Sequence, residues 1–341
     1  MDIEQNGVGI LPVKSHGRAL PPVFCRELGV DWRGQRDRLG EAVRSWLASS
    51  PSMHTRIGYS GDLRQFLRFQ EIEAGHWEKL IGLLPSHVSG WRDSLVDAGY
   101  SQASIRRKVI AVRSLFTYLQ TFGYAGANPA HGKFVKTPAP ARDGKTIALS
   151  PHDCRMLLDA ADTSTPIGIR DRAILATLAY SACRVGELVR LRVGDYRRQA
   201  EHHVLNILGK GGKERVVPLH LEAVERLREW KEVAGIADEH AGPLFRSVCS
   251  SRGHGRDGFL HSHITVRAVE YLVARYVRRL GLPSGVSVHS LRVTALTTAR
   301  HRGADIIDLQ DFAGHADPRT TLAYIRSQER LSKSPTYVLR Y

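Results

Sequence analysis

Apolar residues recur at the spacing of a helix face through most of the chain. This pattern predicts a mainly helical protein with a small antiparallel β-sheet. Between residues 38 and 124 it predicts four helices. The first two carry apolar stripes that begin at Leu39 and Tyr59, and the third covers His87 to Ala98. The fourth is the longest, with Ser101 as its cap and a stripe that begins at Ile105.

The pattern breaks between residues 128 and 147, where proline, glycine and basic residues predict an extended linker. Such a segment fits either a plain tether or the joint of a two-domain clamp. We therefore expect five parts: a flexible arm over 1–35, a helical domain over 36–127, the linker over 128–147, a second domain over 148–329 and a tail over 330–341.

The second domain begins at Ser150-Pro151, which has the form of a cap followed by a proline in the first helical turn. His203–Leu208 and Glu214–Leu219 are short, branched and apolar, and the Gly-Lys-Gly-Gly-Lys sequence between them predicts a hairpin. Residues 249–263 show no apolar period and are expected to form a loop. Helices are predicted through Leu191 and then over 221–233, 266–280, 291–302, 306–312 and 318–329.

The chain is strongly basic, with 49 Lys and Arg against 34 Asp and Glu and a net charge of +15. This balance favours a polyanionic partner, and nucleic acid first of all, because each neutralised phosphate releases counterions. A soluble basic protein without such a partner is the alternative. The residues proposed for phosphate contact lie on the fourth helix, in the linker and in the hairpin, although a solvated charged face is the common alternative. They are Arg106, Arg107, Lys108, Arg113, Lys136, Lys213 and Arg215.

The sequence shows neither a membrane span nor a secretory signal, and its cysteine usage is typical of a reducing compartment. We therefore expect a cytoplasmic protein. No stretch has the length of a membrane-spanning helix, so no membrane partner is expected, and the N-terminus begins acidic, unlike a secretory signal. The four cysteines are scattered without a CxxC pair, which is typical of free thiols in a reducing compartment.

Two segments offer groups suited to phosphoryl chemistry. Arg184 and Glu187 are one helical turn apart, so the carboxylate can orient the guanidinium towards phosphate oxygens. Lys210 is flanked by glycines at the hairpin tip, where it can reach a DNA groove and protonate a leaving oxygen. Taken singly, the first is more often a surface ion pair and the second simply an exposed tip.

Two further segments follow. His289 and Arg292 share a helix face, and they combine a group that exchanges protons near neutral pH with a permanent cation. Later, Gly314 is expected to end one helix, and Asp317 and Pro318 to begin the next. This corner holds His315 and places Tyr324 about two turns into the new helix, although a helical tyrosine is usually only part of a core.

Together these segments resemble the tyrosine recombinase (phage integrase and Xer-like) family. Its pattern is Arg-x-x-Glu-Leu, Gly-Lys-Gly-x-Lys, His-x-Leu-Arg, and Gly-His followed nine residues later by Tyr. The resemblance covers Ser150 to the C-terminus strongly and residues 38–124 only by pattern. Val293 stands where the family often has His, Arg or Lys, and the loop with His254, His261 and His263 is longer and richer in histidine than expected. The spacing of these histidines fits no familiar metal-ligand set, so no metal is assigned.

The resemblance implies a helical, SAM-like core DNA-binding domain and a mixed α+β catalytic domain that form a C-shaped clamp. It implies that Tyr324 attacks a phosphodiester and becomes joined to the 3′-phosphate. Arg184 and Arg292 would bind the phosphate oxygens, and Glu187 would orient the site. Lys210 would protonate the leaving 5′-oxygen, His289 would exchange a proton with Tyr324 or hydrogen-bond the phosphate, and His315 would donate to it. No cofactor is implied, because the phosphotyrosyl ester conserves the energy of the broken bond.

The implied partners are a duplex with inverted repeats, three further protomers in a homotetramer on two duplexes, and accessory DNA-bending proteins. The tail would dock on a neighbouring protomer. The expected function is site-specific recombination, either integration and excision or the resolution of cointegrates and dimers, of a mobile element. Two alternatives remain. One is a type IB topoisomerase-like enzyme that relaxes DNA, and the other is a catalytically silent DNA-binding protein.

Overall fold

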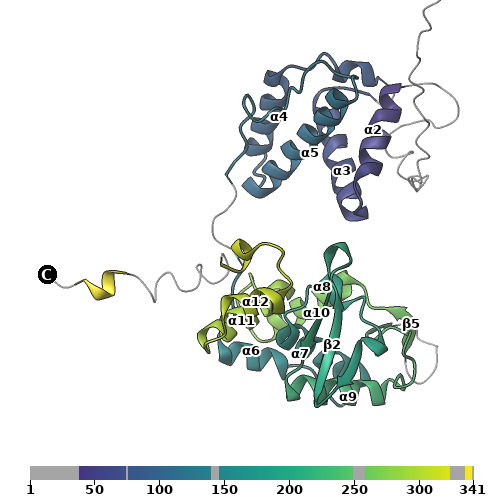
Figure 1. Cartoon of the computed structure of the whole chain (residues 1–341), viewed down its shortest axis with the longest axis vertical. Coiled ribbons are helices and arrows are strands. Elements are labelled where there is room, and N and C mark those ends of the chain that lie inside the picture. Colours follow the sequence, from purple (N-terminus) through teal and green to yellow (C-terminus); the bar gives the residue numbers. More distant parts are fainter. Residues whose placement is uncertain (1–37, 74–75, 140–145, 249–257, 323–334, 340–341) are drawn as a thin grey trace, which may run out of the picture. The chain divides into compact units, whose positions relative to one another are not determined.

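The computed structural model describes residues 38–73, 76–139, 146–248, 258–322 and 335–339 (Figure 1). The chain divides into two compact units, Met1–Ala141 and Arg142–Tyr341, and each has its own hydrophobic core. The predicted arm over residues 1–35 lies outside the described residues. In the described parts of both units, no helix has the length and apolar character to cross a membrane.

The first unit is a helical bundle built from the four predicted helices. They are α2 (Arg38–Ser49), α3 (Met53–Phe69), α4 (Pro85–Asp97) and α5 (Gln102–Thr121), with a short 3-10 turn η1 (Trp77–Leu80). The prediction of Ser101 as the cap of the last helix is confirmed, because its side chain accepts a hydrogen bond from the backbone N–H of Ser104 at 3.2 Å. Trp46, Phe66, Trp91 and Phe116 are buried between the helices.

Part of the predicted linker packs into this unit. Ala130 and Val135 are fully buried, and Arg113 on α5 donates hydrogen bonds to both of their carbonyl oxygens, at 2.7 and 2.9 Å. Arg106 donates to the carbonyl oxygen of Pro138 at 3.2 Å. The segment from residue 128 to 138 is therefore held against α5, and the connection between the units is shorter than the composition suggested.

The basic face predicted for α5 is only partly exposed. Lys108 is buried, and its ammonium group donates to Asp62 at 3.1 Å and to Gln65 at 2.6 Å. Arg107 forms an ion pair with the same Asp62. The expectation of a solvent-facing, phosphate-binding side chain is therefore wrong for Lys108. Arg113 also donates two hydrogen bonds to carbonyl oxygens of the packed segment. Some of the basic side chains of α5 therefore stabilise the helical bundle through buried contacts.

The second unit is organised around α7 (Pro166–Ser181), whose segment from Ala173 to Leu178 is buried on all sides. Figure 1 shows α9 below it, and α6, α11 and α12 on its left. Ser150 caps α6 as predicted, by accepting from the backbone N–H of Asp153 at 3.0 Å. The other helices are α6 (Pro151–Leu158), α8 (Val185–Leu188), α9 (Leu221–Val233), α10 (Val266–Arg279), α11 (Val288–His301) and α12 (Ile306–Ala313), with 3-10 turns η2 (Val193–Asp195), η3 (Lys210–Gly212) and η4 (Pro335–Val338).

A three-stranded antiparallel sheet carries the predicted hairpin. Its strands are β1 (Tyr196–Gln199), β2 (His202–Leu208) and β3 (Glu214–Pro218), and Leu208 pairs with Glu214 at the turn. The hairpin prediction is confirmed. The loop prediction for residues 249–263 is wrong at its end, because Phe259–His263 forms β5 and pairs with β4 (Arg246–Val248). β5 is mostly exposed, and only Phe259 at its start packs against the core, beside Trp230, so its sequence shows no apolar period.

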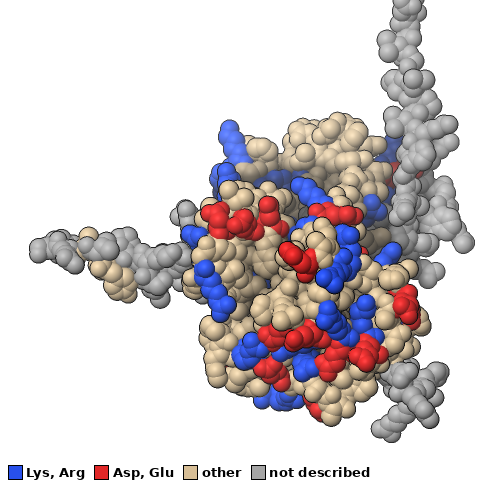
Figure 2. Space-filling model, turned by 60° about the horizontal axis from the view of Figure 1, so that its bottom comes forward, with Lys and Arg blue, Asp and Glu red and all other residues tan. Residues whose placement is uncertain are grey.

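On one face of the second unit, charges of both signs are mixed. Figure 2 shows acidic and basic side chains interspersed on the face of the second unit that α9 forms. Several of these groups are paired across helices, as Arg155 is with Glu222. The excess of positive charge is therefore not concentrated on this face. Of the four cysteines, the structure describes Cys154 and Cys183, and both are free thiols.

Candidate active site

Arg184 lies where the chain turns out of α7 into the single turn of α8. α7 ends at Ser181, and Ala182 adopts a left-handed conformation with φ of 49°. Arg184 is the N-cap of α8, with an extended backbone. Its Nη1 donates to Oε1 of Glu187 at 2.8 Å, and its backbone N–H donates to Oε2 at 2.9 Å. The predicted pair is confirmed, but it lies at a helix start and not within a helix.

Glu187 is the buried centre of this part of the site. Besides Arg184, it accepts a hydrogen bond from Nη2 of Arg215 on β3, at 2.8 Å from Oε2. Burial alone would raise the pKa of its carboxyl group. The hydrogen bonds from Arg215 and from the backbone N–H of Arg184 outweigh burial and lower that pKa. Glu187 is therefore ionised at neutral pH, and it holds two guanidinium groups with one carboxylate.

Arg292 is almost fully buried and lies at the start of the second turn of α11, three residues after His289. It donates to the carbonyl oxygens of Ala182 and Ala313, the latter at 2.6 Å. These carbonyls lie at the ends of α7 and α12, so Arg292 connects three helices. Its Nη2 also lies 2.8 Å from Nε2 of His315. These contacts bring Arg292 next to the Gly314–His315 turn.

The corner after α12 has the predicted form. Gly314 ends α12 in a left-handed conformation with φ of 61°, and the backbone N–H of His315 donates to the carbonyl oxygen of Gln310 at 3.1 Å. Asp317 accepts from the backbone N–H of Arg319 at 2.8 Å, and residues 318–322 are helical. Tyr324 itself lies outside the described residues.

The His315 ring lies between two partners that define its protonation. Because an arginine can only donate, Nε2 of His315 accepts from Arg292. The proton of the neutral ring is then on Nδ1, which lies 2.8 Å from Oγ1 of the fully buried Thr321. Burial first, and the charges of Arg292 and Arg184 next, lower the pKa of His315 to about 4. The ring is therefore neutral at physiological pH.

His289 differs from His315 in exposure, although the same charges act on it. Its side chain is exposed. Loss of hydration against the surrounding atoms lowers its pKa, and the positive charges of Arg292 and Arg184 lower it further. A neutral imidazole at the surface of a cationic site can accept a proton from an incoming hydroxyl group.

The structure thus gathers Arg184, Glu187, Arg292 and His315 in one cluster, with Nη2 of Arg184 lying 3.4 Å from the carbonyl oxygen of Gly314. Two guanidinium groups at one corner can bind the oxygens of a phosphodiester and stabilise the charge that develops on it. Lys210 lies in the turn of the β2–β3 hairpin, as predicted. Lys213, at the end of the same turn, is exposed.

Sequence reasoning missed the roles of two residues. Arg215 was assigned to DNA, but it contacts Glu187, and Thr321 was not considered at all. A signal for Arg215 existed, because alternate residues of a strand face the same side and Val217 is an obvious core residue. No comparable signal marked Thr321, which lies in the described helical residues 318–322, three positions before Tyr324 in the sequence.

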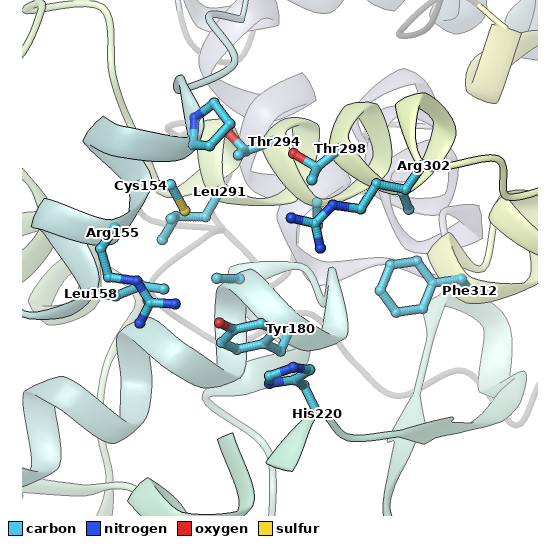
Figure 3. A pocket seen from close by; sticks show the side chains of 14 residues that line it. Cys154, Arg155, Leu158, Tyr180, His220, Leu291, Thr294, Thr298, Arg302 and Phe312 are labelled. Carbon is cyan, nitrogen blue, oxygen red and sulfur yellow. The ribbon is translucent and has the colours of Figure 1, made fainter. Parts of the chain in front are cut away.

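A separate pocket of about 410 Å³ lies between α6, α7, α11 and α12 (Figure 3). In Figure 3, Tyr180 and His220 stack face to face, with their ring centroids 4.7 Å apart. Leu158, Leu291 and Phe312 contribute apolar lining, and Arg155 and Arg302 contribute charge. None of the predicted catalytic residues lines this pocket, so the pocket is distinct from the arginine cluster.

Metal ligands are not grouped in the part of the chain that the structure describes, where no cluster of three His, Cys, Asp or Glu side chains could hold an ion. In the histidine-rich segment, Nδ1 of His261 lies 3.6 Å from Glu239. His254 lies outside the described residues, as do most residues of the loop.

Known protein families account for both units. Residues 148–330 match the model described as the phage integrase family, and residues 46–121 match that of the phage integrase N-terminal SAM-like domain. The tyrosine recombinase XerC of Pelobacter propionicus is 33% identical over 80% of this chain and 84% of that protein. The tyrosine recombinase XerD of Listeria monocytogenes is 29% identical over 80% of this chain and 88% of that protein.

Solved structures share the fold. A lambda integrase dimer bound to a core site aligns with a TM-score of 0.65 at 17% identity, and the alignment covers 86% of this chain and 96% of that one. A XerH site-specific recombinase, in a post-cleavage complex with a palindromic difH substrate, aligns with a TM-score of 0.64 at 18% identity. That alignment covers 92% of this chain and 94% of the other.

Proposed function

The chain belongs to the phage integrase family of tyrosine recombinases, and it is a site-specific DNA recombinase; we propose that Tyr324 is the nucleophile with which it cleaves and rejoins DNA. The observation that carries the assignment is the convergence of Arg184 and Arg292 on the Gly314–His315 corner. The described helical segment runs from Pro318 to Leu322, and Tyr324 follows two positions later in the sequence. We propose that a phosphate bound by the two arginines is attacked by this residue, nine positions after His315.

In the proposed reaction, the phenolic oxygen of Tyr324 attacks the scissile phosphorus, and the bond from phosphorus to the 5′-oxygen breaks. The product is a 3′-phosphotyrosyl ester and a free 5′-hydroxyl. Arg184 and Arg292 neutralise the additional charge on the phosphate oxygens. His289 accepts the proton of the Tyr324 hydroxyl, and Lys210 supplies a proton to the leaving 5′-oxygen. Attack by a 5′-hydroxyl from another strand reverses these steps and rejoins the DNA.

The contacts of His315 support a positioning role. The sequence suggested that it donates a hydrogen bond to phosphate, but Nε2 accepts from Arg292 and Nδ1 faces Thr321. We propose that His315 orients the guanidinium of Arg292, which in turn holds the phosphate. Glu187 has the corresponding role for Arg184, through two hydrogen bonds to it. Each phosphate-binding arginine then has its own buried partner.

We propose double-stranded DNA with inverted repeats as the substrate, bound in a C-shaped clamp by both units. One lambda integrase structure is a dimer bound to a COC' core site, the XerH structure is bound to a palindromic difH substrate, and another lambda integrase structure is a tetramer bound to a Holliday junction. We further propose recombination by a homotetramer on two duplexes, with DNA-bending accessory proteins and exchange of the tail over residues 330–341; the tetrameric lambda integrase structure supports the first of these. We also propose a cytoplasmic location, which the scattered cysteines without a CxxC pair support.

The contacts in the structure divide the proposed phosphate-binding residues. Lys136 and Lys213 are exposed, and they remain candidates for direct contact with DNA. Arg107 is half exposed beside Asp62, so it can still contribute positive charge at the surface. Arg106 and Arg113 hold the segment over residues 130–138, and Lys108 is internal. We therefore expect the last three residues to affect DNA binding through the stability of the first unit.

A covalent trapping assay tests the function. Wild-type protein and Tyr324→Phe are incubated with supercoiled DNA that carries sequence from beside the gene, and adducts that survive denaturation are detected. We expect an adduct with the wild type alone, and recombinant products when two sites are present. An adduct with Tyr324→Phe would move the nucleophile elsewhere. Relaxation of plasmid by a monomer without a specific site would favour the topoisomerase-like alternative, and binding without any adduct would favour a silent DNA-binding protein.

A further inference from the structure

Arg215 lies on β3, two residues past the turn that contains Lys210, and its side chain is only 12% exposed. The next residue on the same side of the strand is Val217, which is buried in the core of the unit. The side chain of Arg215 is therefore directed into the protein. A side chain with so little exposed surface is poorly placed to contact a DNA backbone.

One contact of Arg215 is with Glu187. Its Nη2 lies 2.8 Å from Oε2, the oxygen that also accepts from the backbone N–H of Arg184. The other oxygen of Glu187 accepts from the guanidinium of Arg184 at 2.8 Å. A single carboxylate thus joins β3 to the proposed phosphate-binding arginine, and Arg215 restrains the plane of that carboxylate.

The other contact is with Gly314. A Cβ atom on Gly314 would lie 3.0 Å from Nη1 and 3.2 Å from Cδ of Arg215, closer than ordinary van der Waals contact. The absence of a side chain at position 314 therefore leaves the space that Arg215 fills. Arg215 in this way packs against the turn that immediately precedes His315.

We propose that Arg215 is a positioning residue that links the hairpin carrying Lys210 to Glu187 and to the Gly314–His315 turn. It maintains the geometry of Arg184 and of the hairpin without touching DNA. This inference rests on the proposed function, in which Arg184 binds the scissile phosphate and Lys210 protonates the leaving oxygen. An arginine suits the role because its fork can bond a carboxylate while its other edge packs against a backbone turn.

The hairpin needs such a restraint because its turn is rich in glycine. Gly211 and Gly212 both have positive φ, at 77° and 79°, in a region that glycine enters without strain. Such a turn has little stiffness of its own, so the position of Lys210 depends on what anchors β3. A misplacement of about 1 Å in a reacting group can cost roughly 100-fold in rate.

The experiment measures binding and chemistry separately on an oligonucleotide duplex with the site at which the wild type forms its adduct. Single-turnover adduct formation is timed at saturating protein, and the dissociation constant is measured at several salt concentrations. The variants are Arg215→Gln, Arg215→Lys, Glu187→Gln and the double variant Arg215→Gln with Glu187→Gln. The matched control is Arg197→Gln on β1, because Arg197 is an exposed arginine of the same sheet that bonds only weakly to Asn206, at 3.4 Å.

We expect Arg215→Gln to slow adduct formation on bound DNA by roughly 100-fold, with less than about a threefold change in the dissociation constant. Arg215→Lys keeps the positive charge but loses the planar guanidinium with its paired N–H donors. Its adduct formation should therefore also be slow. If Arg215 acts through Glu187, the double variant should be no slower than Glu187→Gln alone. Arg197→Gln should retain the wild-type rate.

Two results would overturn the proposal. In the first, Arg215→Gln binds DNA more weakly, its salt dependence falls by about one counterion, and its rate on bound DNA is unchanged. Arg215 would then be a phosphate contact. Multiplying rate effects in the double variant would show that Arg215 does not act through Glu187. If Arg215→Gln fails to fold, as thermal melting would reveal, Arg215→Lys gives the same comparison. Failure of the proposed function is distinct, because then the wild type itself forms no adduct or the adduct survives in Tyr324→Phe.

Discussion

Nη2 of Arg292 lies 2.8 Å from Nε2 of His315, and both side chains are buried. Because the guanidinium always donates, the imidazole accepts, and its single proton faces Thr321. This relationship places a neutral histidine between a permanent cation and a hydroxyl group. Burial first, and then the positive charge of Arg292 in contact with the ring, lower the pKa of His315 to about 4.

The buried neutral state of His315 predicts a pH-dependent contribution to stability. Its pKa is lower in the folded than in the unfolded chain, so the unfolded chain binds more protons between about pH 6.5 and 4, and stability falls as the pH falls through this window. The loss should reach about 3 kcal/mol at the acid end. Urea unfolding of the wild type and His315→Gln, at pH 7.5 and 4.5, measures it. A wild-type loss no larger than that of His315→Gln would contradict the assignment.

The lowered pKa of His289 predicts the acid limb of the pH–rate profile. If neutral His289 accepts the Tyr324 proton, cleavage should slow only below the ordinary pKa of histidine, about 6.5, with a slope of one proton. Single-turnover cleavage across pH 5 to 8 measures this limb, and His289→Gln should be slower and lack it. An acid limb that persists in His289→Gln would assign the titration to another group.

Gly314→Ala combines two costs that a matched variant can separate. The left-handed backbone at Gly314 costs an alanine about 1 kcal/mol, and the added Cβ would also meet Arg215. Gly281 has nearly the same φ, 65°, but nothing within 4 Å of an added Cβ. We therefore expect Gly314→Ala to destabilise the protein more than Gly281→Ala, as measured by thermal unfolding. Gly314→Ala should also slow cleavage. Equal destabilisation by the two variants would show that the contact with Arg215 is unimportant.

Lys210→Ala should abolish cleavage of ordinary DNA, because the 5′-oxygen would leave without a proton. A substrate with sulfur in place of that bridging oxygen releases a thiolate, whose conjugate thiol has a pKa of about 8.5 and which needs no such proton. We expect this substrate to restore adduct formation by Lys210→Ala to near the wild-type rate. The same sulfur should not rescue Arg184→Ala, which lacks a phosphate contact. Rescue of both variants, or of neither, would remove Lys210 from the role of proton donor.

Local features of this chain could be predicted from sequence because their physical causes are local. The caps at Ser101 and Ser150 accept hydrogen bonds from residues three positions away, and the turn at Gly314 needs only a residue that tolerates positive φ. The hairpin followed from two apolar strands around glycines. The motif residues Arg184, Glu187 and Arg292 also come together as the family resemblance implied.

The rest depended on contacts between residues far apart in the chain. The outward direction expected for Lys108 failed because Asp62, on another helix, draws it into the bundle. β5 escaped prediction because the strand is mostly exposed: it pairs with β4 through the backbone, and Phe259 is its one residue that packs against the core. Periodicity indicates which face of an element is apolar. Periodicity does not indicate which buried carboxylate will pair with a given arginine.

The sequence by itself determined the chemical groups of the candidate site and the local turns that present them, because residue identity and short-range hydrogen bonds require nothing beyond neighbouring residues. The tertiary structure alone decided the partners of those groups: Arg215 for Glu187, and His315 and the carbonyl of Ala313 for Arg292. These partners come from segments brought together only when α7, α11, α12 and the sheet pack around one core. Packing therefore determines which arginines are held rigidly inside the site and which remain at the surface.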